Sequence, residues 1–134
     1  MEKIEHIGIA VKDIEASNEL FGALFGKKHY KTEAVESEGV ITSFFKNGPN
    51  KIELLQATNE DSPIAKFIEK KGEGIHHIAF AVANIEKEIA RLKGEGFKMI
   101  HEKPKKGADN KLIAFLHPKA TNGVLIELCQ EIDS

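Results

Sequence analysis

Apolar and polar positions alternate along short stretches of this chain and then change to helical spacing. Residues 4–11 alternate as a half-buried strand does. Asp13 then offers an N-cap, apolar residues follow at helical spacing, and Gly26 predicts the end of the helix. Three short strand-like stretches come next, near 29–35, 39–46 and 51–56. The first part of the chain therefore predicts the order βαβββ.

The chain also contains an internal repeat. The stretches HIGIAVKDIE (6–15) and HIAFAVANIE (77–86) are identical at six of ten positions. A second match, IELLQ (52–56) against IELCQ (126–130), occurs in the same order and at similar spacing. Two matches in one order indicate a duplication of a half-size module. We expect two tandem βαβββ modules within a single domain over residues 1–134.

The second module repeats the order of elements in the first. A strand over 75–82 precedes Asn84, which offers the N-cap of the next helix. Strands are then predicted near 97–102, 111–117 and 123–130. A connector helix over 61–72 separates the modules, with Ser62 as its N-cap and Pro63 at its first position. Module one then covers 1–60, module two covers 73–134, and the fold class is α+β.

Strand alternation divides the histidines into two kinds. His6 and His77 occupy equivalent positions on faces whose other residues are small, whereas His76 points to the opposite face. Glu53 and Glu127 are equivalent in the closing strands, where a buried carboxylate needs a partner. Imidazole and carboxylate groups suit first-row metals or Mg²⁺. The pattern therefore indicates one divalent metal site with open positions for water or substrate. The alternative is that the histidines are hydrogen-bonded core residues and the glutamates lie on a solvated face.

Composition narrows the class of protein. With 134 residues, 41% of them hydrophobic and 30% charged, the chain is typical of a soluble globular domain. Nineteen cationic against 21 anionic residues give a net charge of −2, which argues against a nucleic-acid partner. Cys129 is the only cysteine, and no apolar stretch approaches the roughly 20 residues of a membrane span. The N-terminus lacks a signal-peptide pattern, so a cytoplasmic protein is expected.

Several longer stretches resemble the vicinal oxygen chelate superfamily (glyoxalase, bleomycin resistance and dioxygenase proteins), and within it the methylmalonyl-CoA epimerases. The resemblance covers nearly the whole chain and is carried by HIGIAVKDIEAS (6–17), SEGVITSFF (37–45), IELLQ (52–56), SPIAKFIEKKGEGIHHIAFAV (62–82) and IAFLHPKATNGVLIEL (113–128). It implies a curved, barrel-like, eight-stranded mixed sheet around a metal site, with the helices outside. The metal ligands of that family correspond to His6, Glu53, His77 and Glu127, the set that alternation selects.

The resemblance also implies an isomerase that interconverts (R)- and (S)-methylmalonyl-CoA through a metal-stabilised enolate. The cofactor would be a divalent ion, Co, Zn, Ni, Mn or Mg, and the sequence does not identify which. Glu127 is the first candidate for a catalytic base, and Glu53 could act from the opposite side. Some relatives carry a separate glutamate where this chain has Thr42, a residue that cannot serve as a base.

Candidate substrate contacts lie in the second module. Lys103, Lys105 and Lys106 could meet the phosphates of a CoA thioester, because lysine binds phosphate as a point charge. His117 and Lys119 belong to the FLHPK stretch, where a role in a turn is an equal alternative to substrate contact. Superfamily resemblance further suggests a homodimer, and neither a nucleic acid nor a membrane is expected as a partner.

Two alternative functions stay open. Glyoxalase I resembles this chain in fold and metal ligands, but its common sequences carry an arginine four residues after the first metal histidine, where this chain has Ala10. The only arginine here, Arg91, is expected on the outer side of a helix. The other alternative is a metal-free small-molecule binding protein of the same fold, although such proteins usually lack a complete ligand set.

Overall fold

The computed structural model describes residues 1–132 and divides into two compact units. The first unit is His6–His76, and the second joins Met1–Glu5 to the chain from His77 onward. The boundaries fall inside two strands, β1 (Ile4–Ala10) and β5 (Gly74–Ala81). The two units correspond closely to the two halves of the repeat.

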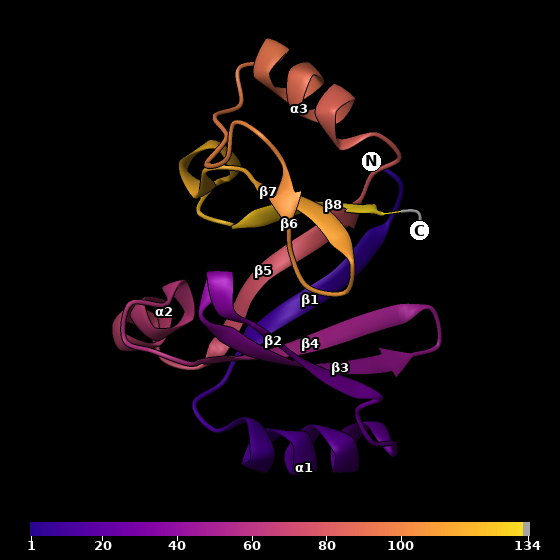
Figure 1. Cartoon of the computed structure of the whole chain (residues 1–134), viewed down its shortest axis with the longest axis vertical. Helices are drawn as coiled ribbons and strands as arrows, with labels where there is room; N and C mark the ends of the chain where they lie inside the picture. The colour runs from indigo at the N-terminus through magenta and orange to yellow at the C-terminus, as the bar shows by residue number, and fades with distance from the viewer. Residues whose placement is uncertain (133–134) are drawn as a thin grey trace. The chain divides into compact units, whose positions relative to one another are not determined.

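The first unit contains a four-stranded sheet in the order β2-β3-β4-β1 (Figure 1). β1 runs parallel to β4, whereas β2 and β4 both run antiparallel to β3. Its other elements are α1 (Ile14–Phe25), β2 (Lys31–Val35), the short 3₁₀ helix η1 (Glu36–Glu38), β3 (Val40–Asn47), β4 (Asn50–Ala57) and α2 (Pro63–Lys71). The expected βαβββ order of module one and the connector helix are confirmed.

Helix α1 forms as its end signals predict. The Asp13 carboxylate accepts hydrogen bonds from the N–H groups of Glu15 and Ala16, and Gly26 ends the helix in the left-handed conformation with φ of 72°. Its apolar side packs on one face of the sheet through a cluster that includes Phe45 and Leu54. Burial of this helical stripe, rather than helix propensity, supplies most of the stability.

Helix α2 packs on the residues of the first module. The Ser62 hydroxyl accepts the Ile64 N–H, Pro63 occupies the first turn, and Gly72 follows the last helical residue. Ile64 is buried in a cluster with Val40 and Leu55. Because successive strand residues point to opposite faces, Leu55 faces away from Leu54 and toward the side that carries Glu53. α1 and α2 therefore contact opposite faces of the same sheet.

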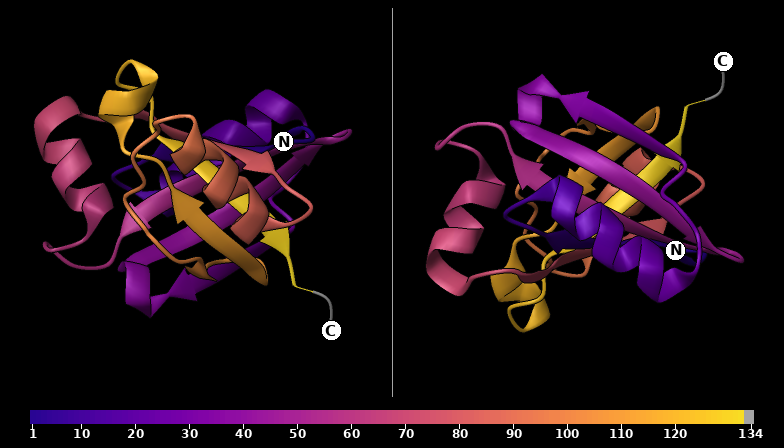
Figure 2. Two further views of the ribbon diagram at one scale, coloured as in Figure 1. Left: turned by 90° about the horizontal axis from the view of Figure 1, so that it is seen from above. Right: turned by 90° about the horizontal axis from the view of Figure 1, so that it is seen from below.

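The second unit has an equivalent sheet in the order β5-β8-β7-β6. β5 is parallel to β8, and β7 is antiparallel to both β8 and β6. The remaining elements are α3 (Ile85–Gly94), β6 (Lys105–Lys106), β7 (Lys111–Phe115), the short 3₁₀ helix η2 (Pro118–Thr121) and β8 (Ile126–Glu131). Figure 2 shows α3 over β8 in one view and α1 over β3 and β4 in the other.

One predicted strand is wrong and one begins later than expected. Residues 97–102 form only an isolated bridge between Met99 and Leu116. On the side of β7 that faces away from β8, the short strand β6 is the paired strand. Two causes explain the gap: the His101 side chain accepts the N–H of Phe115 that a ladder would use, and Pro104 has no N–H to donate. The strand expected over 123–130 begins at Ile126, because the preceding residues belong to a turn.

No helix of residues 1–132 combines the length and the apolar character that a membrane crossing requires.

Candidate active site

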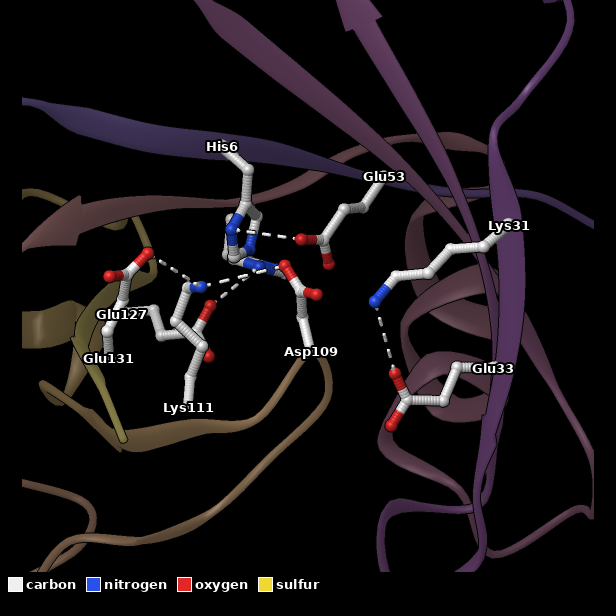
Figure 3. A network of polar contacts seen from close by, with 9 residues as sticks. His6, Lys31, Glu33, Glu53, Asp109, Lys111, Glu127 and Glu131 are labelled. Atoms are coloured by element: carbon white, nitrogen blue, oxygen red, sulfur yellow. Dashed lines mark ion pairs between the residues drawn. The ribbon is translucent and has the colours of Figure 1, made fainter. Parts of the chain in front are cut away.

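A buried histidine–glutamate pair lies on the sheet of the first unit. His6 of β1 and Glu53 of β4 are each 5% exposed, and His6 Nδ1 lies 3.1 Å from Glu53 Oε2 (Figure 3). Gly8 stands opposite Glu53 in the parallel register, so the strand next to the carboxylate presents no side chain there. The small neighbours that the sequence indicated therefore leave space beside the pair.

The second unit holds the equivalent pair. His77 Nε2 of β5 lies 3.0 Å from Glu127 Oε1 of β8, and both side chains are buried. Ala79 stands opposite Glu127, the counterpart of Gly8 in the first unit. Each histidine of the predicted set thus lies beside a glutamate of its own module, across a parallel strand pair in each case.

Each carboxylate also has a phenylalanine directly opposite it in the antiparallel register. Phe44 of β3 faces Glu53, and Phe115 of β7 faces Glu127. The His77 ring meets Phe115 edge to face, with centroids 5.6 Å apart. Directly opposed residues point to the same face, so each pair has an aromatic wall beside it. The sequence analysis did not assign these phenylalanines to the site, although aligning the two repeats through HIGIAVKDIE and HIAFAVANIE would have matched them.

The donor chemistry of both pairs fits a divalent metal ion. An imidazole nitrogen and a carboxylate oxygen suit Zn, Co, Ni or Mn, and Mg²⁺ accepts the carboxylate oxygen. Each pair belongs to a cluster of buried residues whose possible ligand atoms lie within metal-binding reach. Both pairs are buried. A metal ion bound to each carboxylate would compensate the cost of removing that carboxylate from water.

Thr42 of β3 stands opposite Leu55, two residues along each strand from the Phe44–Glu53 pair, and so lies on the same face as Glu53. It is 1% exposed, and its hydroxyl has no hydrogen-bond partner among the residues that the structure describes. A buried hydroxyl without a partner carries a desolvation cost that a bound ligand or water would remove.

The candidate substrate residues occupy several places in the second unit. Lys105 and Lys106 form β6, and Lys103 lies exposed in the segment before it. His117 Nδ1 accepts the backbone N–H of Lys119 at 3.2 Å and caps η2, so His117 has a structural role in this turn. No contact in the structure tests whether these residues meet a substrate, and their assignment stays a prediction.

Sequence reasoning missed a buried cation in the second unit. Lys111 begins β7 and is 6% exposed, with Nζ 3.6 Å from Asp109 Oδ2 and 3.8 Å from Glu131 Oε1 (Figure 3). It stands opposite Glu131, four residues along each strand from the Phe115–Glu127 pair, and so lies on the Glu127 face. Alternation groups Glu127 with Cys129 within β8, but only the register between β7 and β8 places Lys111 on this side.

The other histidines are engaged in local contacts. His76 meets the Phe67 ring of α2 edge to face, with centroids 5.0 Å apart. His29 lies beside Phe45, at a centroid distance of 5.8 Å. His101 accepts the Phe115 N–H. His6 and His77 are thus the histidines whose buried contacts with a glutamate are seen within residues 1–132.

Comparison with known proteins places these features in a family. Residues 5–115 match the family model described as Glyoxalase/Bleomycin resistance protein/Dioxygenase superfamily. The chain belongs to this superfamily. It is 39% identical to the ethylmalonyl-CoA/methylmalonyl-CoA epimerase of Cereibacter sphaeroides, over 96% of this chain and 97% of the relative. It is 37% identical to the mitochondrial methylmalonyl-CoA epimerase of Homo sapiens, over 96% of this chain and 73% of the relative.

A solved structure gives the same result for the fold. A methylmalonyl-CoA epimerase in complex with methylmalonyl-CoA and ammonium has a TM-score of 0.93 and 36% identity to this chain, and the match covers 98% of this chain and 95% of that one. This chain therefore has the expected α+β fold of two βαβββ modules, and the predicted fold class is confirmed.

Proposed function

We propose that this protein is a methylmalonyl-CoA epimerase, an isomerase that interconverts (R)- and (S)-methylmalonyl-CoA. The observation that carries the proposal is the pair of buried, repeat-equivalent histidine–glutamate contacts in a chain 37–39% identical to named epimerases. The relatives act on CoA thioesters by name, and a solved epimerase of the same fold holds methylmalonyl-CoA. The substrate of this chain is accordingly a small-molecule CoA thioester.

The reaction inverts one carbon, which lies between a thioester and a carboxylate. Removal of its proton gives an enolate, and return of a proton to the opposite face gives the other stereoisomer. Such a reaction needs a proton acceptor on one side and a donor on the other. Glu127 is the first candidate for one role and Glu53 for the other, since each contributes a buried carboxylate from an equivalent strand. Thr42 cannot take either role.

We further propose that His6, Glu53, His77 and Glu127 together hold one divalent metal ion per chain. The proposal is supported by the matching donor types, the repeat equivalence and the correspondence to the ligand set of the family. When bound, the ion supplies positive charge beside the oxygen on which the enolate charge develops. Its identity among Co, Zn, Ni, Mn and Mg depends on supply as well as affinity.

Isotope exchange tests the reaction. Metal-loaded protein is incubated with methylmalonyl-CoA in deuterated water, and loss of the α-proton is followed by NMR. We expect exchange together with epimerisation, and loss of more than about 100-fold in rate for Glu127→Gln, as is typical when a general base is removed. Glu69→Gln, an exposed change on α2, serves as the control. Turnover of a glutathione hemithioacetal without α-proton exchange would instead assign the protein to the glyoxalases.

Two further properties belong to the same proposal. We propose a homodimer and a cytoplasmic location, the homodimer on the strength of superfamily resemblance. Light scattering of the purified protein measures the first, and a monomer at micromolar concentration would contradict it. Fractionation of the source cells measures the second.

A further inference from the structure

A further carboxylate projects from the edge strand of the first unit. Glu33 of β2 stands directly opposite Thr42 of β3, and Thr42 stands opposite Leu55 of β4, two residues from Glu53. Directly opposed residues in antiparallel strands share a face, as do residues two apart in one strand. Glu33 therefore lies on the face of the sheet that carries Glu53, and the proposed function gives it no role.

Lys31 connects this carboxylate to the aromatic residue beside Glu53. Its Nζ lies 3.9 Å from Glu33 Oε1 and 4.7 Å from the centroid of the Phe44 ring. Lys31 stands opposite Phe44, and Phe44 stands opposite Glu53. Figure 3 shows Lys31 and Glu33 extending from β2 with their charged ends toward each other. The Lys31–Glu33 pair therefore adjoins the Phe44–Glu53 pair on one face of the sheet.

Glu33 and Glu53 differ in their access to water. The side chain of Glu33 is 37% exposed, whereas that of Glu53 is 6% exposed. Their Cα atoms are two strands (about 10 Å) and two residues (about 7 Å) apart by strand geometry, so a small acyl group has room between the carboxylates. An acid–base group that exchanges its proton with solvent needs the access to water that Glu33 has.

The reaction benefits from a carboxylate outside the proposed metal ligands. Glu53 Oε2 lies 3.1 Å from His6 Nδ1, and Glu53 is also a proposed ligand of the divalent ion. A carboxylate bound to a divalent ion is held in its ionised form and takes up a proton less readily. Lys31 affects Glu33 less, because it carries a single charge, lies beyond hydrogen-bond distance and is partly exposed.

We propose that Glu33 is the second acid–base group of the epimerisation, in the role first given to Glu53. The inference rests on the proposed function and leaves the other proton transfer to Glu127. In one direction Glu33 takes the α-proton, and the electron pair of the broken C–H bond moves into the enolate. The other acid–base group then returns a proton to the opposite face of the carbon. The reverse direction uses the same two groups with their protonation states exchanged, so no net proton is consumed.

Stereospecific isotope exchange separates the two groups. Each pure stereoisomer of methylmalonyl-CoA is incubated with metal-loaded protein in deuterated water, and α-proton loss and epimerisation are followed separately by NMR. In Glu33→Gln, epimerisation should fall more than about 100-fold, as on removal of a general base. One stereoisomer should still exchange within about tenfold of the parent rate, because the remaining group acts on its face. The other stereoisomer should lose exchange by more than about 100-fold.

Two further variants control for charge and for folding. Glu36→Gln, an exposed change on η1, removes the same charge from the next segment and should keep the parent rates for both stereoisomers. Glu33→Asp keeps a carboxylate on a shorter side chain, so the affected stereoisomer should exchange at least about tenfold faster than in Glu33→Gln. In Glu33→Gln, KM should change by less than about threefold, because the lost interaction belongs to the transition state.

The outcomes that overturn the proposal are distinct from failure of the proposed function. Exchange of both stereoisomers at the parent rates in Glu33→Gln would overturn it and return the role to Glu53. An equal loss of exchange from both stereoisomers would also overturn it, because a group that acts on one face of the carbon affects one stereoisomer. If the proposed function itself fails, the parent protein neither exchanges nor epimerises methylmalonyl-CoA.

Discussion

His6 Nδ1 lies 3.1 Å from Glu53 Oε2, and the two side chains reach this distance from parallel strands that are nearly fifty residues apart in the chain. Both are 5% exposed. The equivalent contact of His77 with Glu127 is almost identical in length, at 3.0 Å. Duplication has therefore preserved a buried pair as well as a sequence pattern, which makes the two pairs matched targets for experiment.

Metal stoichiometry is the first prediction. We expect one divalent ion per chain after loading and dialysis, and a large loss of retained metal for His6→Ala and for His77→Ala alike, because each removes a ligand of the same proposed ion. Elemental analysis of the purified protein measures this. His29→Ala, at a histidine packed beside Phe45, is the control. Two ions per chain, each lost in only one variant, would show that the pairs bind metal separately.

The buried hydroxyl of Thr42 gives the second prediction. Thr42→Val removes a polar group without a partner, so the free energy of unfolding should stay equal or rise by up to about 1 kcal/mol, while KM for the substrate rises. Ser43→Ala is a matched control, since Ser43 is also buried with an unpartnered hydroxyl but stands opposite Leu54, on the face that α1 covers. Denaturant unfolding and steady-state kinetics measure both. Unchanged kinetics for Thr42→Val would show that its hydroxyl does not contact the substrate.

Lys111 gives the third prediction, on stability. Its Nζ lies beyond hydrogen-bond distance from both Asp109 and Glu131, so the ion pairs offset only part of the cost of burying the ammonium group. Lys111→Met keeps the apolar stem and should change the free energy of unfolding by less than about 1 kcal/mol. Lys111→Ala also removes the stem and should cost about 2 kcal/mol. Equal losses of unfolding free energy in the two variants would mean that the charge of Lys111, rather than its apolar stem, stabilises the protein.

The fourth prediction concerns acid stability. The Arg91 guanidinium, which hydrogen-bonds to Glu88, and the amino group of Met1 lower the pKa of the Glu88 carboxyl below its ordinary value of 4.5. A lowered folded-state pKa gives stability that is present above the ordinary pKa and lost as the pH falls through the folded value. Unfolding free energy measured from pH 6 downward should therefore fall less steeply below about pH 4.5 in Glu88→Gln. Glu69→Gln should follow the parent curve, and a parent-like slope in Glu88→Gln would contradict the assignment.

Alternation and end signals in the sequence determined much of the local structure. Asp13, Ser62 and Asn84 cap their helices as expected, and each expected module adopts its βαβββ order. The exposed position of Arg91 on α3 is also as predicted. These features depend on neighbours within a few residues, because caps and strand faces are local properties of the backbone.

The same local rule selected both histidine–glutamate pairs. Strand period separates His6 from the large apolar residues of its strand and Glu53 from those of its own strand, and a repeat in the sequence marks His77 and Glu127 as their counterparts. What the period could not supply is which strands become neighbours. Parallel pairing of β1 with β4 and of β5 with β8 brings each histidine to its glutamate, and that choice is made by long-range burial.

Tertiary structure alone decided the remaining features. Residues 97–102 read as a strand, but the His101 side chain takes the N–H that pairing would need. Lys111 and Thr42 are polar residues whose burial depends on what packs around their strands. Local periodicity therefore fixed the face on which each side chain lies, whereas long-range packing determined its neighbours and its access to water.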